Sequence, residues 1–398
     1  MQAGKVVYLD NNATTRVADE VVTEMLPFFT GLYGNPSSTH RFGGQLEGHV
    51  ATARARVASL LGANPSEIVF TSGGTESNNA AIRGALQSYP ERKGIVTTAV
   101  EHPAVGNLCR HLAEAGYSVS VIPVDRAGRL DLDRLRRAVN QDTAIVSVMW
   151  ANNETGVMFP VEEAAALAHA QGAMFFHTDA VQAVGKIPID LFRATDIDLL
   201  ALSGHKLHAP KGVGVLYVRQ GTRLAPFLVG GHQEGGRRAG TENVPGIVAL
   251  GKACQLAQTR LQDERARISL LRGRLEAGLL EAIPGAMING EGSMRLPNTL
   301  NIGFESVSGE AVVARLSERG ICASSGSACN SGSLEPSPVL RAMGVPSSSA
   351  NGAIRLSLSA YNTEEEIDYA LRELPRAVAD LRQASPSERQ ADACCRFR

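Results

Sequence analysis

A repeated order of apolar segment, glycine-containing turn and helical stretch limits the folds open to this chain. Ile68-Val69-Phe70 is followed by Thr71-Ser72-Gly73-Gly74-Thr75 and then by a stretch of helical character. This alternation is typical of a mostly parallel β-sheet covered by helices. Such sheets bind ligands beyond the carboxyl ends of their strands. Further strand-like segments occur at 119–124, 144–149, 174–176, 199–202 and 214–218, with helical stretches such as 160–170 between them.

The pattern changes from about residue 251, where a charged helical stretch at 258–280 precedes shorter segments. A last helix begins near Thr363 and Glu366, which have the spacing of a capping box. A length of 398 residues favours two packed domains in one chain. We predict a large α/β domain at 16–255, a smaller α+β domain at 256–385, an N-terminal segment 1–15 that joins the smaller domain, and a flexible tail at 386–398.

Composition argues against two classes of partner. Lysine and arginine total 39 and aspartate and glutamate total 40, which leaves a formal net charge of −1. A chain so balanced has no bulk charge with which to hold nucleic acid or a membrane surface. The start of the chain lacks the pattern of a secretory signal, the longest apolar runs are too short to span a bilayer, and the six cysteines are scattered. We therefore expect a cytoplasmic protein.

Two groups of polar residues follow strand-like segments at positions suited to an aldehyde cofactor. Lys206, in the sequence SGHK, comes just after a buried strand, where a partly desolvated amine can form a Schiff base. Asp179 follows another such segment, where its carboxylate can keep a pyridinium nitrogen protonated, and Gln182 can bind the ring oxygen. Taken singly, a lysine in a turn and an aspartate that caps a helix are both common.

Two further features fit the same cofactor. Gly74 and Thr75 open a helix after a glycine turn, and free backbone N–H groups at such a terminus bind phosphate. His102, in the sequence EHP, can stack on a planar ring or move protons. A glycine turn before a helix and a lone histidine also have ordinary structural explanations. Because all four features occur in chain order at strand ends, we predict a site for pyridoxal 5′-phosphate (PLP).

Residues 324–333 form a serine- and glycine-rich stretch with one cysteine, Cys329, near its middle. This composition predicts a mobile loop. Ten extended residues span about 33 Å, so a thiol at the tip of a there-and-back loop could move on the order of 15 Å. Alone, the stretch would be a flexible loop with an incidental thiol. Beside a PLP site, it predicts a thiolate that takes sulfur from the substrate and hands it to another protein.

These residues lie in motifs that resemble the cysteine desulfurases of the class V aminotransferase family, and most of all the NifS type (NifS/IscS subgroup). The similarity covers nearly the whole chain, from YLDNNATT at 8–15 to IRLS at 354–357. Between them lie TSGGTES, EHPAV, NNETG, HTDAVQ, SGHKLHAPKG, RRAGTEN and SSGSAC. The resemblance implies fold type I of the PLP-dependent transferases, with a large, mostly parallel-sheet α/β domain that binds the cofactor. It also implies a smaller C-terminal α+β domain that carries the catalytic cysteine loop.

The resemblance assigns a role to each matching residue. Lys206 would hold the cofactor covalently and later move protons, His102 would stack on its ring, and Cys329 would be the nucleophile. Asn153 would contact cofactor and substrate, and Arg355 would grip the substrate carboxylate with its bidentate guanidinium group. The other contacts implied are Asp179 at the ring nitrogen, Gln182 at the ring hydroxyl, Gly74, Thr75, Ser203 and His205 at the phosphate, and Thr241 at the phosphate of the neighbouring subunit of a homodimer.

The activity implied is the removal of sulfur from L-cysteine, which gives L-alanine and a persulfide on Cys329. A scaffold protein would accept the sulfur for iron–sulfur cluster assembly, in particular for nitrogenase maturation. Cys329 would meet iron only in a transient contact through its persulfide. The chain departs from the family pattern at Cys322, where a small non-thiol residue is expected, at Ala360, where a basic residue is expected, and in the tail pair Cys394-Cys395.

Other functions stay open from the residues alone. A class V aminotransferase or a selenocysteine lyase shares the cofactor, although a transaminase has no use for Cys329. A metal- or cluster-binding scaffold would use Cys322, Cys329, Cys394 and Cys395, but the chain lacks the usual ligand spacing and has no Cys-x-x-Cys. The sequence does not identify the sulfur acceptor.

Overall fold

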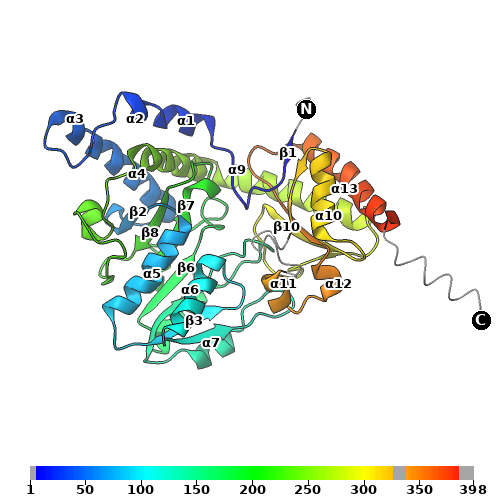
Figure 1. Cartoon of the computed structure of the whole chain (residues 1–398), viewed down its shortest axis with the longest axis horizontal. Helices are drawn as coiled ribbons and strands as arrows, with labels where there is room; N and C mark the ends of the chain where they lie inside the picture. The colour runs from blue at the N-terminus through cyan, green and yellow to red at the C-terminus, as the bar shows by residue number, and fades with distance from the viewer. Residues whose placement is uncertain (1–5, 326–336, 385–398) are drawn as a thin grey trace, which may run out of the picture.

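Seven strands form one mostly parallel sheet in the order β2-β8-β7-β6-β5-β3-β4 (Figure 1). In the computed structural model, which describes residues 6–325 and 337–384, β3 to β7 run parallel and β8 is antiparallel to both of its neighbours. The strands are β2 (Ile68–Thr71), β3 (Gly94–Thr98), β4 (Ser118–Ile122), β5 (Thr143–Ser147), β6 (Phe175–Asp179), β7 (Leu199–Ser203) and β8 (Gly214–Val218).

Helices cover both faces of this sheet (Figure 1), and short 3₁₀ turns lie before β2, after β7 and before α9. The 3₁₀ turns are η1 (Pro65–Glu67), η2 (Gly204–Lys206) and η3 (Gln233–Gly236). The α-helices are α1 (Asp19–Met25), α2 (Pro27–Thr30), α3 (Arg41–Gly44), α4 (Leu46–Leu61), α5 (Gly74–Ser88), α6 (Pro103–Glu114), α7 (Leu132–Ala138), α8 (Val161–Ala170), α9 (Val244–Ala282), α10 (Gly309–Glu318), α11 (Pro338–Ala342), α12 (Ser347–Ala350) and α13 (Glu364–Ala384).

Neighbouring residues of the central strands point to opposite faces of the sheet. Ile145 packs into a hydrophobic cluster with α5 and α6, whereas Val146 packs into another with α4, α8 and α9. In the same way, Leu199 packs into the first of these clusters and Leu200 into the second. Because side chains alternate along a strand, a sheet with helices on both faces needs unbroken apolar strands. The apolar runs in the sequence therefore have their physical cause in this two-sided burial.

A second, antiparallel sheet has the order β12-β13-β10-β9. Its buried face packs against α10, α13 and the second half of α9 in a separate hydrophobic cluster. The N-terminal segment joins this unit through β1, which pairs in parallel with β11. The strands are β1 (Val7–Tyr8), β9 (Ala286–Ile288), β10 (Thr299–Phe304), β11 (Ile321–Cys322), β12 (Ser324–Ser325) and β13 (Ala353–Ser357).

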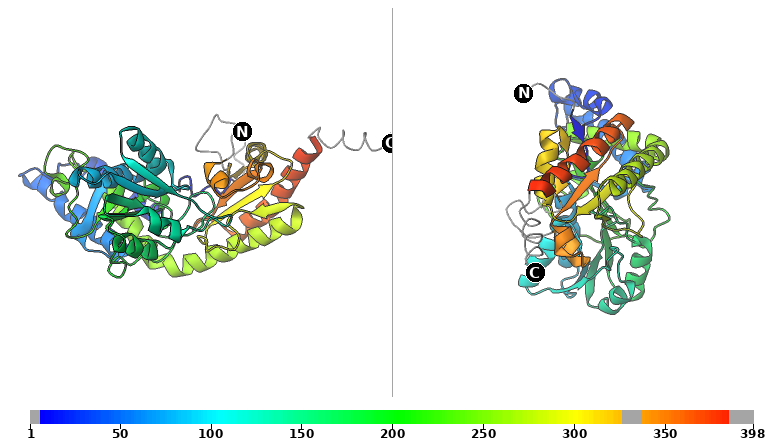
Figure 2. Two further views of the ribbon diagram at one scale, coloured as in Figure 1. Left: turned by 90° about the horizontal axis from the view of Figure 1, so that it is seen from below. Right: turned by 90° about the vertical axis from the view of Figure 1, so that its right-hand side faces the viewer.

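Helix α9 connects the two units without a break over 39 residues. Its first part, including Leu250 and Cys254, is buried in the cluster under the large sheet. Its second part, including Leu271 and Leu275, is buried in the cluster of the smaller sheet. The left view of Figure 2 shows the helix running beneath both units. One helix therefore contributes to both cores.

These observations confirm the predicted fold class, an α/β unit with a large, mostly parallel sheet beside a smaller α+β unit. The predicted domain limits stay a prediction, and the limit between 255 and 256 falls inside α9. Cys329 and the tail pair Cys394-Cys395 lie outside the described residues. No helix in the described part of the chain has the length and apolar character needed to cross a membrane.

Candidate active site

A cavity of about 360 Å³ lies where the ends of several sheet strands meet β12 and β13. It gathers residues from distant parts of the chain, as expected for a ligand site at the carboxyl edge of an α/β sheet. Thr241 does not line this cavity, and it is exposed. The predicted site residues that do line it are Gly74, Thr75, His102, Asn153, Asp179, Gln182, Ser203, His205, Lys206 and Arg355.

Lys206 ends the 3₁₀ turn η2, directly after the buried strand β7. Its Nζ atom donates a hydrogen bond of 2.8 Å to the carbonyl oxygen of Ala13 and a second one to that of Asn12. Both acceptors belong to the N-terminal segment, which therefore holds the amine at the cavity wall. Sequence reasoning gave Asn12 no role, because a main-chain carbonyl leaves no side-chain signal.

Asp179 is the last residue of β6 and is buried at the floor of the cavity. One carboxylate oxygen accepts a 2.7 Å hydrogen bond from the side-chain amide of Asn78, and the other accepts a 3.0 Å bond from the backbone N–H of Val181. The two bonds fix the orientation of the carboxylate. Asn78, on α5, was also missed, since a helical asparagine is not distinctive by itself.

His102 caps the N-terminus of α6, and its Nδ1 atom accepts a 3.1 Å hydrogen bond from the backbone N–H of Ala104. Because Nδ1 is an acceptor, a neutral imidazole carries its proton on Nε2. Burial lowers the pKa of His102, the nearby Asp179 carboxylate acts in the opposite direction, and Lys206 lowers it further. The ring is therefore a neutral, planar group at pH 7.

The turn between β2 and α5 forms an anion seat. Gly73 has φ +155° and ψ −178°, a conformation that essentially only glycine adopts. No side chain caps the first turn of α5, so its N–H groups remain available. A Cβ atom on Gly74 would lie 2.8 Å from a methyl carbon of Val181, so only glycine fits between the helix and the turn after β6.

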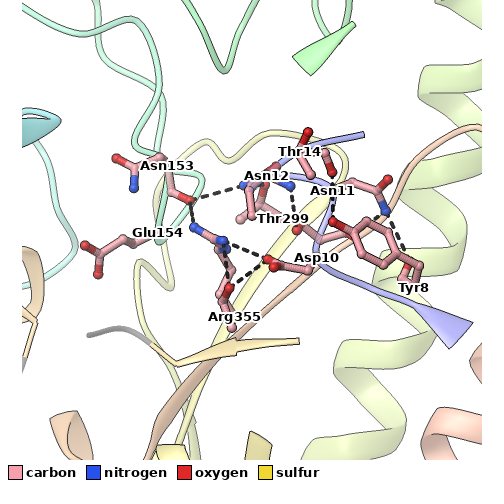
Figure 3. A network of polar contacts seen from close by, with 12 residues as sticks. Tyr8, Asp10, Asn11, Asn12, Thr14, Asn153, Glu154, Thr299 and Arg355 are labelled. Carbon is pink, nitrogen blue, oxygen red and sulfur yellow. Dashed lines mark hydrogen bonds and ion pairs between the residues drawn. The ribbon is translucent and has the colours of Figure 1, made fainter. Parts of the chain in front are cut away.

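Arg355 projects from β13 and is buried among polar groups (Figure 3). Its guanidinium donates to the carbonyl oxygen of Asn153 at 3.0 Å and forms a 2.8 Å ion pair with Asp10. Ser324 lies 3.1 Å from the same guanidinium and donates to the Asp10 carboxylate at 2.8 Å. The Nε atom of Arg355 is buried and has no hydrogen-bond partner among the described residues. Because Arg355 also lines the cavity, its positive charge is placed to attract a carboxylate ligand.

Two buried carboxyl groups border the site and hold their protons tightly. Burial raises the pKa of Glu154 to about 7, although a hydrogen bond from Ser337 and the charge of Arg355 both act to lower it. Burial also raises the pKa of Glu101 to about 8, against hydrogen bonds from the backbone of Met149 and from Thr98. Glu154 lines the cavity and Glu101 precedes the lining residue His102, so the site and its surroundings are less negative near pH 7 than these residue types imply.

Comparison with known proteins agrees with this geometry. The model of the family "Aminotransferase class-V" matches residues 7–370. Cysteine desulfurase 2 of Trichormus variabilis is 58% identical over 388 residues, 97% of this chain and 97% of that protein. Cysteine desulfurase NifS of Azotobacter vinelandii is 58% identical over 381 residues, 96% of this chain and 94% of that protein.

Solved structures show the same relationship. A NifS-like protein has a TM-score of 0.89 and 41% identity, with 94% of this chain and 100% of that one covered. SspA in complex with cysteine has a TM-score of 0.79 and 35% identity, with 89% of this chain and 99% of that one covered. The chain belongs to the class V aminotransferase family. The Trichormus variabilis and Azotobacter vinelandii relatives are cysteine desulfurases, and enzymes of this kind depend on PLP.

The described residues fit PLP, the cofactor of this family. The glycine-opened terminus of α5 suits a phosphate group, and the Asp179 carboxylate suits a protonated ring nitrogen. The amine of Lys206 lines the same cavity and suits the aldehyde. Among the described residues, no group of three or more histidine, cysteine, aspartate or glutamate side chains could hold a metal ion.

Proposed function

We propose that this chain is a cysteine desulfurase that takes sulfur from L-cysteine, releases L-alanine and carries the sulfur as a persulfide on Cys329. The observation that carries the proposal is one cavity lined by an amine, a buried carboxylate and a partly unpaired guanidinium, Lys206, Asp179 and Arg355. These are the groups needed to hold PLP and an amino acid together. The relatives at 58% identity that bear the name cysteine desulfurase support it.

Each residue has a task in this proposal. Bound PLP supplies an electron sink for negative charge on the α-carbon of the substrate. Arg355 binds the substrate carboxylate, and Asp179 keeps the ring nitrogen protonated by its fixed negative charge. Lys206 would take the α-proton and later return a proton, and the neutral His102 ring would pack on the cofactor ring. Overall, the C–S bond of cysteine breaks and an S–S bond to Cys329 forms, so cysteine and a thiol become alanine and a persulfide.

Of the described residues that flank Cys329 in the chain, one lines the cavity and the other contacts a residue of its wall. Ser325, before it, lines the cavity wall. Ser337, after it, donates a 2.5 Å hydrogen bond to Glu154, another residue of that wall. This placement supports Cys329 as the residue that meets the substrate sulfur.

The chain also carries Cys322, whose thiol is the nearest described competitor. Burial raises the pKa of the Cys322 thiol, and the negative charge of Asp10 raises it further. A thiol whose pKa is raised is less often a thiolate at neutral pH and is a poorer nucleophile. The proposed sulfur carrier is therefore Cys329 and not Cys322.

A homodimer is part of the proposal. Thr241 is exposed and absent from the cavity wall of its own subunit, as expected if it reaches the phosphate in the neighbouring subunit. Large apolar side chains lie exposed on the N-terminal helices and on the segment before η3, and a second subunit could cover them: Leu26, Phe29, Tyr33, Phe42, Phe227, Leu228 and Val229.

The acceptor in this proposal is a scaffold protein for iron–sulfur cluster assembly, in particular for nitrogenase maturation. The name NifS of the Azotobacter vinelandii relative supports that assignment. Any iron would be cargo that Cys329 meets only through its persulfide. We place the protein in the cytoplasm, because a thiol that cycles through a persulfide needs a reducing compartment. No part of this proposal needs nucleic acid or a membrane.

A single-turnover experiment tests the proposal. The enzyme is mixed with one equivalent of L-cysteine, thiols are trapped by alkylation, and peptides are analysed by mass spectrometry while alanine is measured. Extra sulfur on Cys329 and one alanine per site are expected, and Cys329→Ala should abolish both. The matched variant Cys322→Ala should retain both. A keto acid in place of alanine would show a transaminase, and sulfur on Cys322 would contradict the assignment of the carrier.

A further inference from the structure

Lys186 is a second lysine next to the site, and the proposed mechanism does not use it. It lies in the turn after β6, seven residues beyond Asp179. Its Nζ atom donates hydrogen bonds to the main-chain oxygen of Gln182 at 3.0 Å and to the side-chain oxygen Oε1 of Gln182 at 3.1 Å. Both bonds end on one residue of the cavity wall.

Lys186 contacts Gln182 from the side away from the larger cavity. It lines a separate cavity of about 70 Å³, and it is not among the described residues that line the larger cavity. Gln182 stands between the two, and its Nε2 atom donates a 3.0 Å hydrogen bond to the carbonyl oxygen of Asn12. Asn12 is also an acceptor for Lys206. The order of contacts is thus Lys186, Gln182, Asn12, Lys206.

These partners leave one orientation for the Gln182 side-chain amide. A carbonyl oxygen can only accept, so the amide must turn its NH₂ group to Asn12. The Lys186 amine then meets the amide oxygen and donates to it. A reversed amide would set two oxygens against each other at Asn12 and two donors against each other at Lys186. The choice of orientation, which is often ambiguous for glutamine, is determined here from both ends.

We propose that Lys186 is a positioning residue that fixes the Gln182 amide so that the N–H not bound to Asn12 serves the cofactor cavity and the amide oxygen is turned away. The proposal rests on the assignment of a PLP site and deepens it. A ring oxygen of PLP that carries negative charge needs a donor at this wall and is repelled by an amide oxygen. Lys186 thereby determines which kind of oxygen the wall accepts without touching the cofactor.

Lys186 can donate to Gln182 in either protonation state. Burial lowers the pKa of Lys186 to about 7, and the positive charges of Lys206 and Arg355 lower it further. A neutral amine still carries N–H donors, so donation to Gln182 persists on both sides of that pKa. A neutral amine can also accept a hydrogen bond, so above that pKa the carbonyl oxygen of Asn12 excludes the reversed amide and Lys186 supports the observed orientation by donation.

A double-mutant cycle tests the proposal by PLP binding in the absence of cysteine. Lys186→Met keeps the length of the side chain and removes its donors. In the wild-type background this change should weaken the affinity of the apoprotein for PLP about 5- to 20-fold, because the hydrogen bond from the Gln182 amide to the cofactor loses its fixed orientation. The visible absorption band of the bound form should also shift. In a Gln182→Leu background the same change should alter the affinity less than about twofold.

Lys252→Met is the matched control. Lys252 is another half-buried lysine, it lies on α9 beside Glu24, and it does not line the PLP cavity. Its replacement should change neither the PLP affinity nor the absorption band. If Lys186→Met fails to fold, Lys186→Arg provides the test. This variant keeps N–H donors, so it should bind PLP with an affinity within about threefold of wild type.

The outcomes separate this inference from the proposed function. An equal effect of Lys186→Met in both backgrounds, no effect in the wild-type background, or a tenfold loss of affinity in Lys186→Arg would overturn the role of Lys186. Each of these leaves desulfurase activity possible. A wild-type protein that binds no PLP would overturn both proposals together.

Discussion

The guanidinium group of Arg355 and the carboxylate of Asp10 lie 2.8 Å apart, although 345 residues separate them in the chain. The pair joins β13 to the N-terminal segment at the wall of the cavity. Asp10 and the carbonyl oxygen of Asn153 hold two of the three guanidinium nitrogens, and the third, Nε, has no partner among the described residues. Arg355 is thus oriented before any substrate arrives.

Replacement of this arginine should affect substrate binding far more than cofactor binding. Arg355→Ala removes a charged donor to the substrate carboxylate, a loss of roughly 2–4 kcal/mol. The KM for L-cysteine should rise accordingly, and PLP content should stay near wild type. Steady-state kinetics and cofactor absorbance measure the two effects.

Arg355→Lys serves as the control for charge alone. A lysine ammonium is a compact point charge without the planar, forked donors of a guanidinium group, so it should recover little of the lost affinity. An unchanged KM in Arg355→Ala would place the carboxylate of the substrate elsewhere.

The covalent link to the cofactor depends on one lysine. Lys206→Ala should abolish turnover and the visible absorption band, and borohydride reduction should no longer attach PLP to the chain. Circular dichroism should show that the fold survives. Lys211→Ala, an exposed lysine five residues further on, should keep the band and the activity. A band retained in Lys206→Ala through a reducible link would mean that another lysine holds PLP.

The buried carboxylate of Asp179 should be indispensable for desulfuration, and its hydrogen-bond partner Asn78 should matter less. Asp179→Asn removes the negative charge that faces the ring nitrogen, so desulfuration should fall roughly 100-fold or more and PLP should bind more weakly. Asn78→Ala removes only one hydrogen bond to that carboxylate, worth about 1–2 kcal/mol. Rates with excess PLP and the PLP dissociation constant provide the comparison. Near-normal desulfuration rates in Asp179→Asn would mean that the Asp179 carboxylate has only a structural role.

Glu101 should make stability depend on pH in a defined direction. Burial raises its pKa to about 8 in the folded chain from an ordinary value near 4.5. The folded state therefore binds this proton more tightly, so the contribution of Glu101 is fully present below about pH 4.5 and is lost as pH rises through 8.

Glu101→Gln removes this titration. Relative to wild type, the variant should gain about 2–4 kcal/mol in the free energy of unfolding between pH 5 and pH 8.5. Urea unfolding at several pH values measures the difference, and Glu114→Gln, at the exposed end of α6, is the matched surface control. A constant difference between wild type and Glu101→Gln would mean that Glu101 titrates normally.

The strand ends that bear the chemistry could be predicted because each places a side chain in a recognisable local pattern. Asp179 is the last residue of β6, and Lys206 follows β7 by one short turn. The contacts that orient these residues could not be predicted, because they come from main-chain oxygens and remote partners. Asn12 acts through its carbonyl group, and Asp10 meets Arg355 only in the folded chain.

The helix at 258–280 shows a different limit of sequence reasoning. The structure begins this helix at Val244, fourteen residues earlier than predicted. Its first part is buried among apolar neighbours and lacks the polar face that marks a surface helix. Periodicity detects a helix where one face meets water, so the two-sided burial of residues such as Ile247, Ala249 and Leu250 concealed the start.

The continuity of α9 determines how this molecule can deform. A domain hinge needs a few residues at the end of an element that absorb large changes of φ and ψ. Between Cys254 and Ile268, the last and first residues that α9 buries in the two cores, the backbone stays helical. Rotation of one sheet against the other would break hydrogen bonds in the middle of a helix, so the two units form one stiff frame. For the same reason, a chain cut between residues 255 and 256 would leave each fragment with a frayed helix and an uncovered core.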